Sequence, residues 1–461
     1  MKKTYLMSCT IFILITIGPI NSRAENKTFI KEYTYMASDI DSKVSSRAIA
    51  LEQVKRALLE QLGTYLVSET EVKNFQMTKD QITTLTAGIV SAEVIDEKWD
   101  GRTYYLKAKI TADPKEVAKS VDALRNDVQK TKELENSKKK AEEAMREVER
   151  LKKELELVKG DTRKQDDYAN AIKDLSAVDW FDKGLVFQKS NNLENAIDAY
   201  TKAIELNPKI AEVYNNRGAA YVELVNNQQA IKDFNKSIEL NPQLAAAYYG
   251  RGIAYANLGN YQQAINDYNK AIELNPSFAE AYNNRGYVYS GLENHLQAIN
   301  DFNKATELNP SFAEAYNNRG VAYSDLGNNQ QAMKDFNKAI KLNPKNADAY
   351  NNRGSVYNDL ENHLQAINDF SKAIKLNPKY AVAYGNRGIS YHKLRNYQKA
   401  INDYDEAIEL NPQYADAYYN RGIAYGALGN NNMAIQNLKI AAAYGSEKAK
   451  NFLRSMGIDW Q

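Results

Sequence analysis

The apolar positions in the C-terminal three-fifths of the chain recur with a fixed period of 34 residues. Counted from Ala177, position 4 of each of eight units is aromatic, position 8 is glycine and position 20 is alanine. The dipeptide Asn-Pro recurs in the same phase, with its prolines at Pro208, Pro242, Pro276, Pro310, Pro344, Pro378 and Pro412. Repetition at such a period is typical of a solenoid built from stacked supersecondary units.

The small residues of each unit predict where two helices meet. Glycine in a helix interior costs about 1 kcal/mol relative to alanine, so its recurrence indicates a close approach of two helix backbones. We expect the alanine of position 20 to be the small residue that faces this glycine. The glycines are Gly184, Gly218, Gly252, Gly286, Gly320, Gly354, Gly388 and Gly422, and the alanines are Ala196, Ala230, Ala264, Ala298, Ala332, Ala366, Ala400 and Ala434.

This pattern resembles the tetratricopeptide repeat over residues 177–448. The resemblance implies that helices A and B of each unit pack antiparallel and that the units stack into a right-handed superhelix. Position 7 departs from the family, which usually has leucine there: this chain has Lys183 and then seven arginines, and six units carry an aspartate sixteen residues later. We interpret these as ion pairs between helices. Residues 449–461, with Ser446 as a helix N-cap, are expected to close the solenoid.

The expected fold class is therefore mainly α: an α-solenoid of eight helical hairpins, preceded by a small α+β domain and a coiled-coil helix. The α+β domain is assigned to residues 25–114. Phe29–Met36 is β-prone, Val44–Leu66 has apolar residues at helical spacing, and a shorter helix is predicted at Lys79–Ala87. Two further strands flank Asp100-Gly101, a strong hairpin signal. The domain weakly resembles small domains of envelope proteins used in flagellar assembly.

Residues 115–160 are highly charged with a sparse apolar stripe at 3 and 4 spacing, which predicts a coiled-coil helix. Such a helix would make the protein a homo-oligomer, dimer or trimer being left open. The alternative is a solvated single helix held by ion pairs along its surface. Residues 161–176 are polar and are interpreted as a linker.

The N-terminus reads as a secretory signal. Lysines 2 and 3 precede a short apolar stretch and the tripeptide Ser22-Arg23-Ala24, so residues 1–24 are expected to be cleaved. Cys9 is the single cysteine of the chain and would be lost with that segment. Export without disulfides favours a bacterial envelope compartment, the periplasm, with secretion as the alternative.

Charge and composition exclude several classes of function. The formal net charge is +2, so no overall field attracts nucleic acid. Three histidines, each in a different unit, make a metal site improbable, and residues 25–114 contain no histidine, no cysteine and no phosphate-binding glycine loop. We therefore expect no catalytic site, no cofactor and no metal.

In the resembled family, positions 2, 6, 9 and 13 of helix A line a concave groove. Position 6 is asparagine in six units and position 2 is acidic in five: Asn216, Asn284, Asn318, Asn352, Asn386 and Asn420, with Glu212, Glu280, Glu314, Asp348 and Asp416. A carboxamide offers both a donor and an acceptor, which match a peptide backbone. The acidic row favours a basic, extended client. Because Tyr-Asn-Asn-Arg-Gly is repeated verbatim in four units, duplication alone is the competing explanation.

These features predict a non-enzymatic scaffold of the bacterial cell envelope that binds a protein or peptide segment in the groove. Association with the cell wall through groove tyrosines such as Tyr249, Tyr287 and Tyr419 is the alternative. An enzyme is the third class, and no residue pattern supports it.

Overall fold

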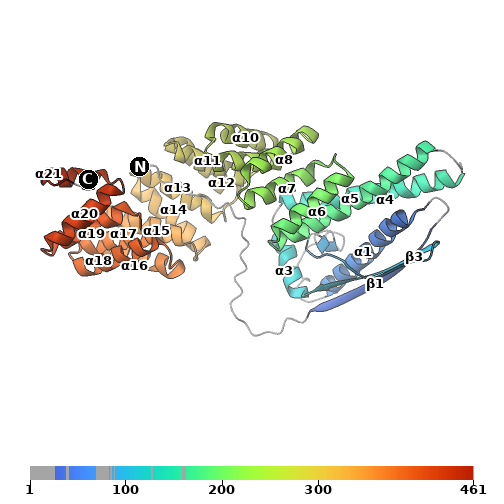
Figure 1. The fold of residues 1–461 in the computed structure, drawn as a ribbon, viewed down its shortest axis with the longest axis horizontal. Helices are drawn as coiled ribbons and strands as arrows, with labels where there is room; N and C mark the ends of the chain where they lie inside the picture. Colours follow the sequence, from blue (N-terminus) through green and yellow to red (C-terminus); the bar gives the residue numbers. More distant parts are fainter. Residues whose placement is uncertain are drawn as a thin grey trace. The chain divides into compact units, whose positions relative to one another are not determined.

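The computed structural model describes residues 26–37, 41–68, 82–83, 86–87, 89–125, 128–157 and 162–459. The predicted signal segment 1–24 and most of the helix predicted at Lys79–Ala87 lie outside these residues. The chain divides into two compact units, residues 1–274 and 275–461, and the ribbon is drawn in Figure 1. The boundary falls between the third and fourth repeats, so the first unit holds the N-terminal region with three repeats and the second holds five.

The N-terminal region contains a three-stranded antiparallel sheet. Strands β1 (Lys27–Met36), β2 (Glu93–Trp99) and β3 (Thr103–Ala112) lie in the order β1-β3-β2. The predicted hairpin is confirmed at Asp100-Gly101, where the Asp100 carboxylate accepts hydrogen bonds from the backbone N–H groups of residues 102 and 103. Alternate residues of β3, from Tyr104 to Ile110, are buried against helix α1 (Lys43–Ser68).

One apolar core joins the sheet to helices that follow it. Helices α3 (Pro114–Arg125), α4 (Val128–Leu157) and α5 (Thr162–Lys189) come next along the chain. Val148 of α4 and Ile172 of α5 belong to the same buried cluster as Leu58 and Leu106 of the α+β region. The expectations of a separate domain at 25–114 and a linker at 161–176 are therefore wrong. Most polar residues of 163–176 lie on the exposed side of α5, whose other side completes this core.

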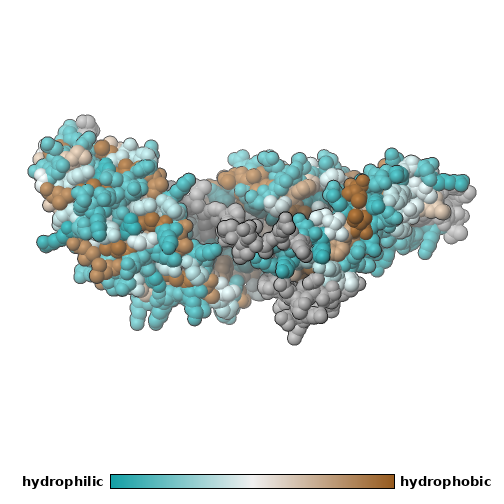
Figure 2. Space-filling view, turned by 90° about the horizontal axis from the view of Figure 1, so that it is seen from below, coloured by the Kyte–Doolittle hydropathy of each residue, from teal (hydrophilic) through white to brown (hydrophobic). Residues whose placement is uncertain are grey.

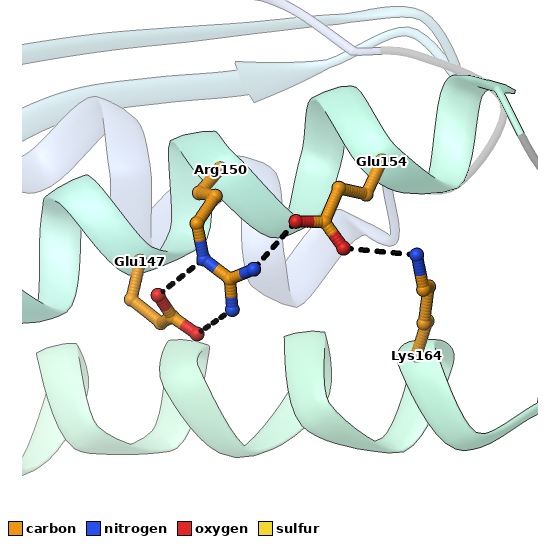
Figure 3. Close-up of polar contacts among 4 residues, drawn as sticks. All are labelled: Glu147, Arg150, Glu154 and Lys164. Atoms are coloured by element: carbon orange, nitrogen blue, oxygen red, sulfur yellow. Dashed lines mark hydrogen bonds and ion pairs between the residues drawn. The ribbon is translucent and has the colours of Figure 1, made fainter.

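Helix α4 packs alongside α5 of the same chain (Figure 1). The stripe predicted as a coiled-coil seam at 115–160 is buried in this hairpin at Ala141, Val148 and Leu151. Figure 3 shows ion pairs that support it: Arg150 lies between Glu147 and Glu154, and Lys164 of α5 donates to the second oxygen of Glu154 at 2.9 Å. In this structure α5 of the same chain packs against the side of α4 that the prediction assigned to a second chain. A helix adjacent in sequence closes on it at a small loop entropy cost.

The predicted helical hairpins are confirmed from the end of α5 onward. Helix A of the first repeat is the C-terminal part of α5, so the helix begins well before Ala177. The remaining helices are α6 (Leu193–Leu206), α7 (Ala211–Glu223), α8 (Asn227–Leu240), α9 (Ala245–Asn257), α10 (Tyr261–Leu274), α11 (Ala279–Gly291), α12 (His295–Leu308), α13 (Ala313–Asp325), α14 (Asn329–Leu342), α15 (Ala347–Asp359), α16 (His363–Leu376), α17 (Ala381–Lys393), α18 (Tyr397–Leu410), α19 (Ala415–Ala427) and α20 (Asn431–Ala443).

The chain closes with helix α21 (Glu447–Ser455). Ser446 is its N-cap, as predicted, and accepts a hydrogen bond from the backbone N–H of Ala449. Leu453 is fully buried against α20, whereas Phe452 and Met456 are exposed. One apolar face therefore covers the last hairpin.

The glycine of position 8 lies against the aromatic ring of position 24 in seven repeats. A Cβ atom on Gly320 would lie 2.7 Å from Cε1 of Phe336, which is closer than real Cβ contacts. The position-20 alanine also lies beside the glycine, as predicted: its carbonyl oxygen would be 3.1 Å from a Cβ on Gly286 and 3.0 Å from one on Gly422. The buried alanines bring the helices together, and the ring fills the space beside the glycine. In the last repeat Leu438 takes the place of the ring.

Among the described residues, no helix combines the length and apolar character that a membrane span requires. In the space-filling view, hydrophilic residues cover most of the coloured surface and separate small hydrophobic patches (Figure 2).

We predict that Gly320→Ala lowers the free energy of unfolding by about 1–3 kcal/mol, because the added methyl group must displace the ring of Phe336 or separate α13 from α14. Urea denaturation followed by circular dichroism measures this. Gly291→Ala is the matched control, since nothing lies within 4 Å of its added Cβ. It should leave stability unchanged or slightly raised. Equal losses in both variants would contradict the contact.

The turn between helices A and B places position 15 in the left-handed region. Three repeats have glycine there, with φ between 74° and 79°, while Val225 has a φ of 60°. A β-branched residue is strained in that conformation by about 1–2 kcal/mol.

We predict that Val225→Gly raises the free energy of unfolding by up to about 1 kcal/mol after the entropy cost of glycine, and that Gly327→Val lowers it. Shifts in the same direction in denaturation midpoints would contradict this account.

Candidate functional site

The arginines of position 7 connect three helices. Arg319 on α13 forms two hydrogen bonds with Asp335 on α14 of its own repeat, both at 2.7 Å. Its Nη1 also donates to Asn303 on α12 of the preceding repeat at 2.8 Å. The predicted ion pair is present in six repeats: Arg217–Asp233, Arg251–Asp267, Arg285–Asp301, Arg319–Asp335, Arg353–Asp369 and Arg387–Asp403. The arginines therefore hold neighbouring repeats in register.

Each of these guanidinium groups also lies over the tyrosine ring of position 4, at 5.2 Å from the ring centroid for Arg319 and Tyr316. Burial lowers the pKa of Arg319, but the hydrogen bonds and charge of Asp335 outweigh this and raise it overall. The arginine is thus charged, paired and largely enclosed. We assign it a structural role, as the sequence indicated.

The asparagines of helix A form a hydrogen-bonded row, which we name the amide chain. It consists of Asn386, Asn351, Asn352, Asn317, Asn318, Asn283 and Asn284, in which each Nδ2 donates to the Oδ1 of the next. The donor–acceptor distances are 3.0–3.5 Å. Position 6 of one repeat donates to position 5 of the repeat before it. The amide chain therefore runs across four repeats of the second unit in one direction.

The asparagines of position 5 were not among the predicted site residues. The signal was present, because Tyr-Asn-Asn-Arg-Gly carries two adjacent asparagines in four repeats. The helical pattern by itself does not show that position 5 reaches the surface formed by position 6 of the next repeat. Only the packing of the next helix A against it brings Asn317 within reach of Asn352.

The predicted position-6 asparagines are not equivalent. Asn284, Asn318, Asn352 and Asn386 belong to the amide chain, whereas Asn216 and Asn420 do not. The preceding repeats carry Phe181 and Gly385 at position 5, neither of which has a carboxamide. In the first unit, Asn216 accepts a hydrogen bond from Asn215 at 3.4 Å, and its buried Nδ2 has no hydrogen-bond partner. In the third repeat the ring of Phe234 occupies the space beside Gly250, where a Cβ would lie 2.4 Å away.

The predicted acidic residues of position 2 also differ from one another in exposure and in their partners. Glu280 and Asp348 are exposed, and Asp416 is half-buried. Glu212 forms an ion pair with Lys140 of α4, with Nζ and Oε2 2.7 Å apart. Glu314 accepts a hydrogen bond from Asn283 of the preceding repeat at 3.4 Å. Burial raises the pKa of Glu314, and the hydrogen bonds from Asn283 and Asn318 offset only part of that effect.

The N-terminal region covers the corresponding surface of the first repeat. Lys55 of α1 contacts Asp182, which occupies position 6, at 2.5 Å and Asp179 at 3.7 Å. Burial by itself lowers the pKa of Lys55, but Asp182, Asp179 and Glu52 raise it overall. Together with the Lys140–Glu212 pair, this contact means that the chain itself occupies these positions in the first two repeats.

Fold and site together define an α-helical repeat protein whose helix A surface carries organised polar side chains. The tetratricopeptide repeat family model matches residues 211–244, 245–278, 279–312, 313–346, 347–380 and 381–414, in the phase predicted above. Two further models of such repeats match residues 184–225 and 403–436. These matches cover more than half of the chain, which therefore belongs to the tetratricopeptide repeat family. Membership indicates a scaffold for protein–protein interaction, whose partners are proteins or peptides.

No curated protein matches the chain. Similar solved structures include a chain of the APC/C hetero-tetramer Cut9-Hcn1, at 22% identity and a TM-score of 0.49 over 64% of this chain. The match spans 59% of that chain. A tetratricopeptide repeat protein from Parabacteroides merdae is 23% identical, with a TM-score of 0.43, covering 56% of this chain and 99% of that one. YrrB, described as having an unusual peptide-binding site, is 29% identical, with a TM-score of 0.34, covering 41% and 96%.

We predict that Asp335→Ala lowers the free energy of unfolding by about 2 kcal/mol, because Arg319 keeps its largely enclosed charge without a carboxylate. Asp335→Asn should cost clearly less. The last repeat supplies the precedent, since Asn437 accepts from Nε of Arg421 at 2.8 Å. Urea denaturation of both variants tests this, and equal losses would show that the carboxamide cannot replace the carboxylate in this position.

Proposed function

We propose that this protein is a non-enzymatic scaffold of the bacterial cell envelope that binds an extended segment of a partner along the helix A surface of repeats four to seven. The amide chain carries this proposal. A carboxamide has two N–H donors and two acceptor lone pairs. The amide chain uses one of each at its interior members, and Asn283 and Asn318 also form hydrogen bonds with Glu314. Asn318, Asn352 and Asn386 are half-buried, whereas the other members of the amide chain are buried. The half-buried carboxamides therefore offer their unused donors and acceptors, which match the alternating N–H and C=O groups of a peptide backbone.

The amide chain supports binding in a second way. Each carboxamide is oriented by its neighbours, so less side-chain entropy is lost when a ligand binds. A hydrogen bond contributes about 1 kcal/mol net, so several such contacts roughly cancel the cost of association. The acidic side chains of position 2 would then add affinity for a basic client. The first two repeats are not part of this proposed surface, because Lys55 and Lys140 already occupy it.

The envelope location is supported by the sequence of the first 24 residues and by the absence of any cysteine after Cys9. The non-enzymatic assignment is supported by family membership. Within the described part of the chain, no group of three or more His, Cys, Asp or Glu side chains is arranged to hold a metal ion.

We predict that replacing Asn284, Asn318 and Asn352 together with Ala weakens peptide binding. The probe is the peptide bound best by the full chain from an array of random twelve-residue peptides, and affinity is measured by fluorescence anisotropy. Loss of about 1 kcal/mol per hydrogen bond predicts a reduction on the order of a hundredfold.

The matched control replaces three exposed asparagines of helix B, Asn300, Asn368 and Asn402, with Ala. It should leave affinity unchanged. Circular dichroism verifies that both triple variants remain helical. Unchanged affinity in the helix A variant, with its helical signal intact, would reject the amide chain as the binding element.

A further inference from the structure

Glu314 differs from the other acidic residues of position 2 in its surroundings. It is the one residue of that row that has both a long side chain and an asparagine at position 5 of the preceding repeat. Asn283 donates to its Oε1 at 3.4 Å, which draws the carboxylate toward the amide chain and away from solvent. Asp348 follows an equivalent asparagine, Asn317, but is one methylene shorter and remains exposed.

The carboxylate of Glu314 therefore lies in a partly desolvated position among neutral carboxamides. Its described contacts are hydrogen bonds from Asn283 and Asn318, and burial outweighs them in its effect on the pKa. A carboxylate in such surroundings gains most from a cation, because neutral donors compensate only part of the lost hydration.

The same chain contains a carboxylate of position 2 with a cation bound. Glu212, at the equivalent place in the second repeat, holds the ammonium group of Lys140 with 2.7 Å between Nζ and Oε2. Its side chain is 13% exposed, so this pair is largely enclosed on the carboxylate side. The lysine comes from α4, which lies outside the repeats. Helix A of this protein therefore accepts a lysine from another element at position 2.

We propose that Glu314, with Asn283 and Asn318, forms the binding site for a lysine ammonium group of the client. This inference rests on the proposed peptide-binding function, and it specifies lysine as the client side chain that this surface recognises. In the second unit, Glu314 takes the part that Glu212 plays toward Lys140. The other acidic residues of the row contribute long-range attraction without a fixed contact.

An ammonium group fits this site better than a guanidinium group. Arginine binds a carboxylate best through two parallel hydrogen bonds that need both oxygens. Asn283 donates to Oε1 of Glu314 and Asn318 also donates to this carboxylate, so the two oxygens are not both free for that parallel pair and a cation is left with a single-point contact. Lysine is a compact charge that satisfies such a contact.

The test compares peptides on the full chain. The best-bound peptide of the random array is resynthesised with each of its lysines replaced in turn by acetyl-lysine, by arginine and by norleucine. We expect one lysine whose acetylation weakens binding by about tenfold or more, which corresponds to about 1.4 kcal/mol. Arginine at that place should bind less tightly than lysine.

The protein variant is Glu314→Gln, which keeps the shape and removes the charge. It should lower affinity for the lysine peptide to that of the acetylated peptide and abolish the preference between them. Glu280→Gln is the matched control at the same position of the preceding repeat, and it should retain the preference. Thermal unfolding by circular dichroism verifies that both variants fold, and the peptide series on the unmodified chain gives a result independent of folding.

The outcomes separate this inference from the function on which it rests. If no peptide binds, both are overturned. If peptides bind without a lysine requirement, or if the requirement survives in Glu314→Gln, the lysine site is overturned and the peptide-binding function stands. A preference for arginine at the critical position would overturn the ammonium assignment.

Discussion

The contact between a glycine on helix A and a buried ring on helix B sets the geometry of every other feature of the repeats. The position-24 rings are at most 1% exposed, and a methyl group on the facing glycine would overlap them in most repeats. Close packing of this kind leaves no freedom to shift one helix along the other. Because each hairpin is fixed internally, the residues that join one hairpin to the next are presented at constant spacing.

The polar contacts between repeats depend on that spacing. Arg319 can reach both Asp335 in its own repeat and Asn303 in the preceding one only because α12, α13 and α14 are held at fixed distances. The amide chain has the same requirement, since Asn352 must meet Asn317. Buried polar networks of this type favour one arrangement over its neighbours, as unsatisfied groups are costly. The proposed binding surface thus depends on the register between repeats that the arginines maintain.

The N-terminal region gives the first repeat the neighbour that a solenoid end lacks. Sheet, α4 and α5 share one core, and Lys55 meets Asp182 at a place equivalent to that of the asparagines. A stacked repeat without a neighbour exposes apolar and polar groups, which terminal caps normally cover. Here the cap also occupies position 2 of the second repeat through Lys140, so the accessible surface is shifted toward the later repeats.

The sequence by itself determined the hairpins, their phase, the hairpin at Asp100-Gly101 and the arginine–aspartate pairs. Each of these follows from local periodicity or from residues at fixed separation on two packed helices. Only the tertiary structure decided that α4 pairs with α5, that an aromatic ring fills the space beside the glycine, and that Lys140 pairs with Glu212. The sequence identifies an apolar stripe that must be buried and a carboxylate that must be paired when it is buried. Which partner each obtains depends on packing between segments far apart in the chain, and no local pattern encodes that.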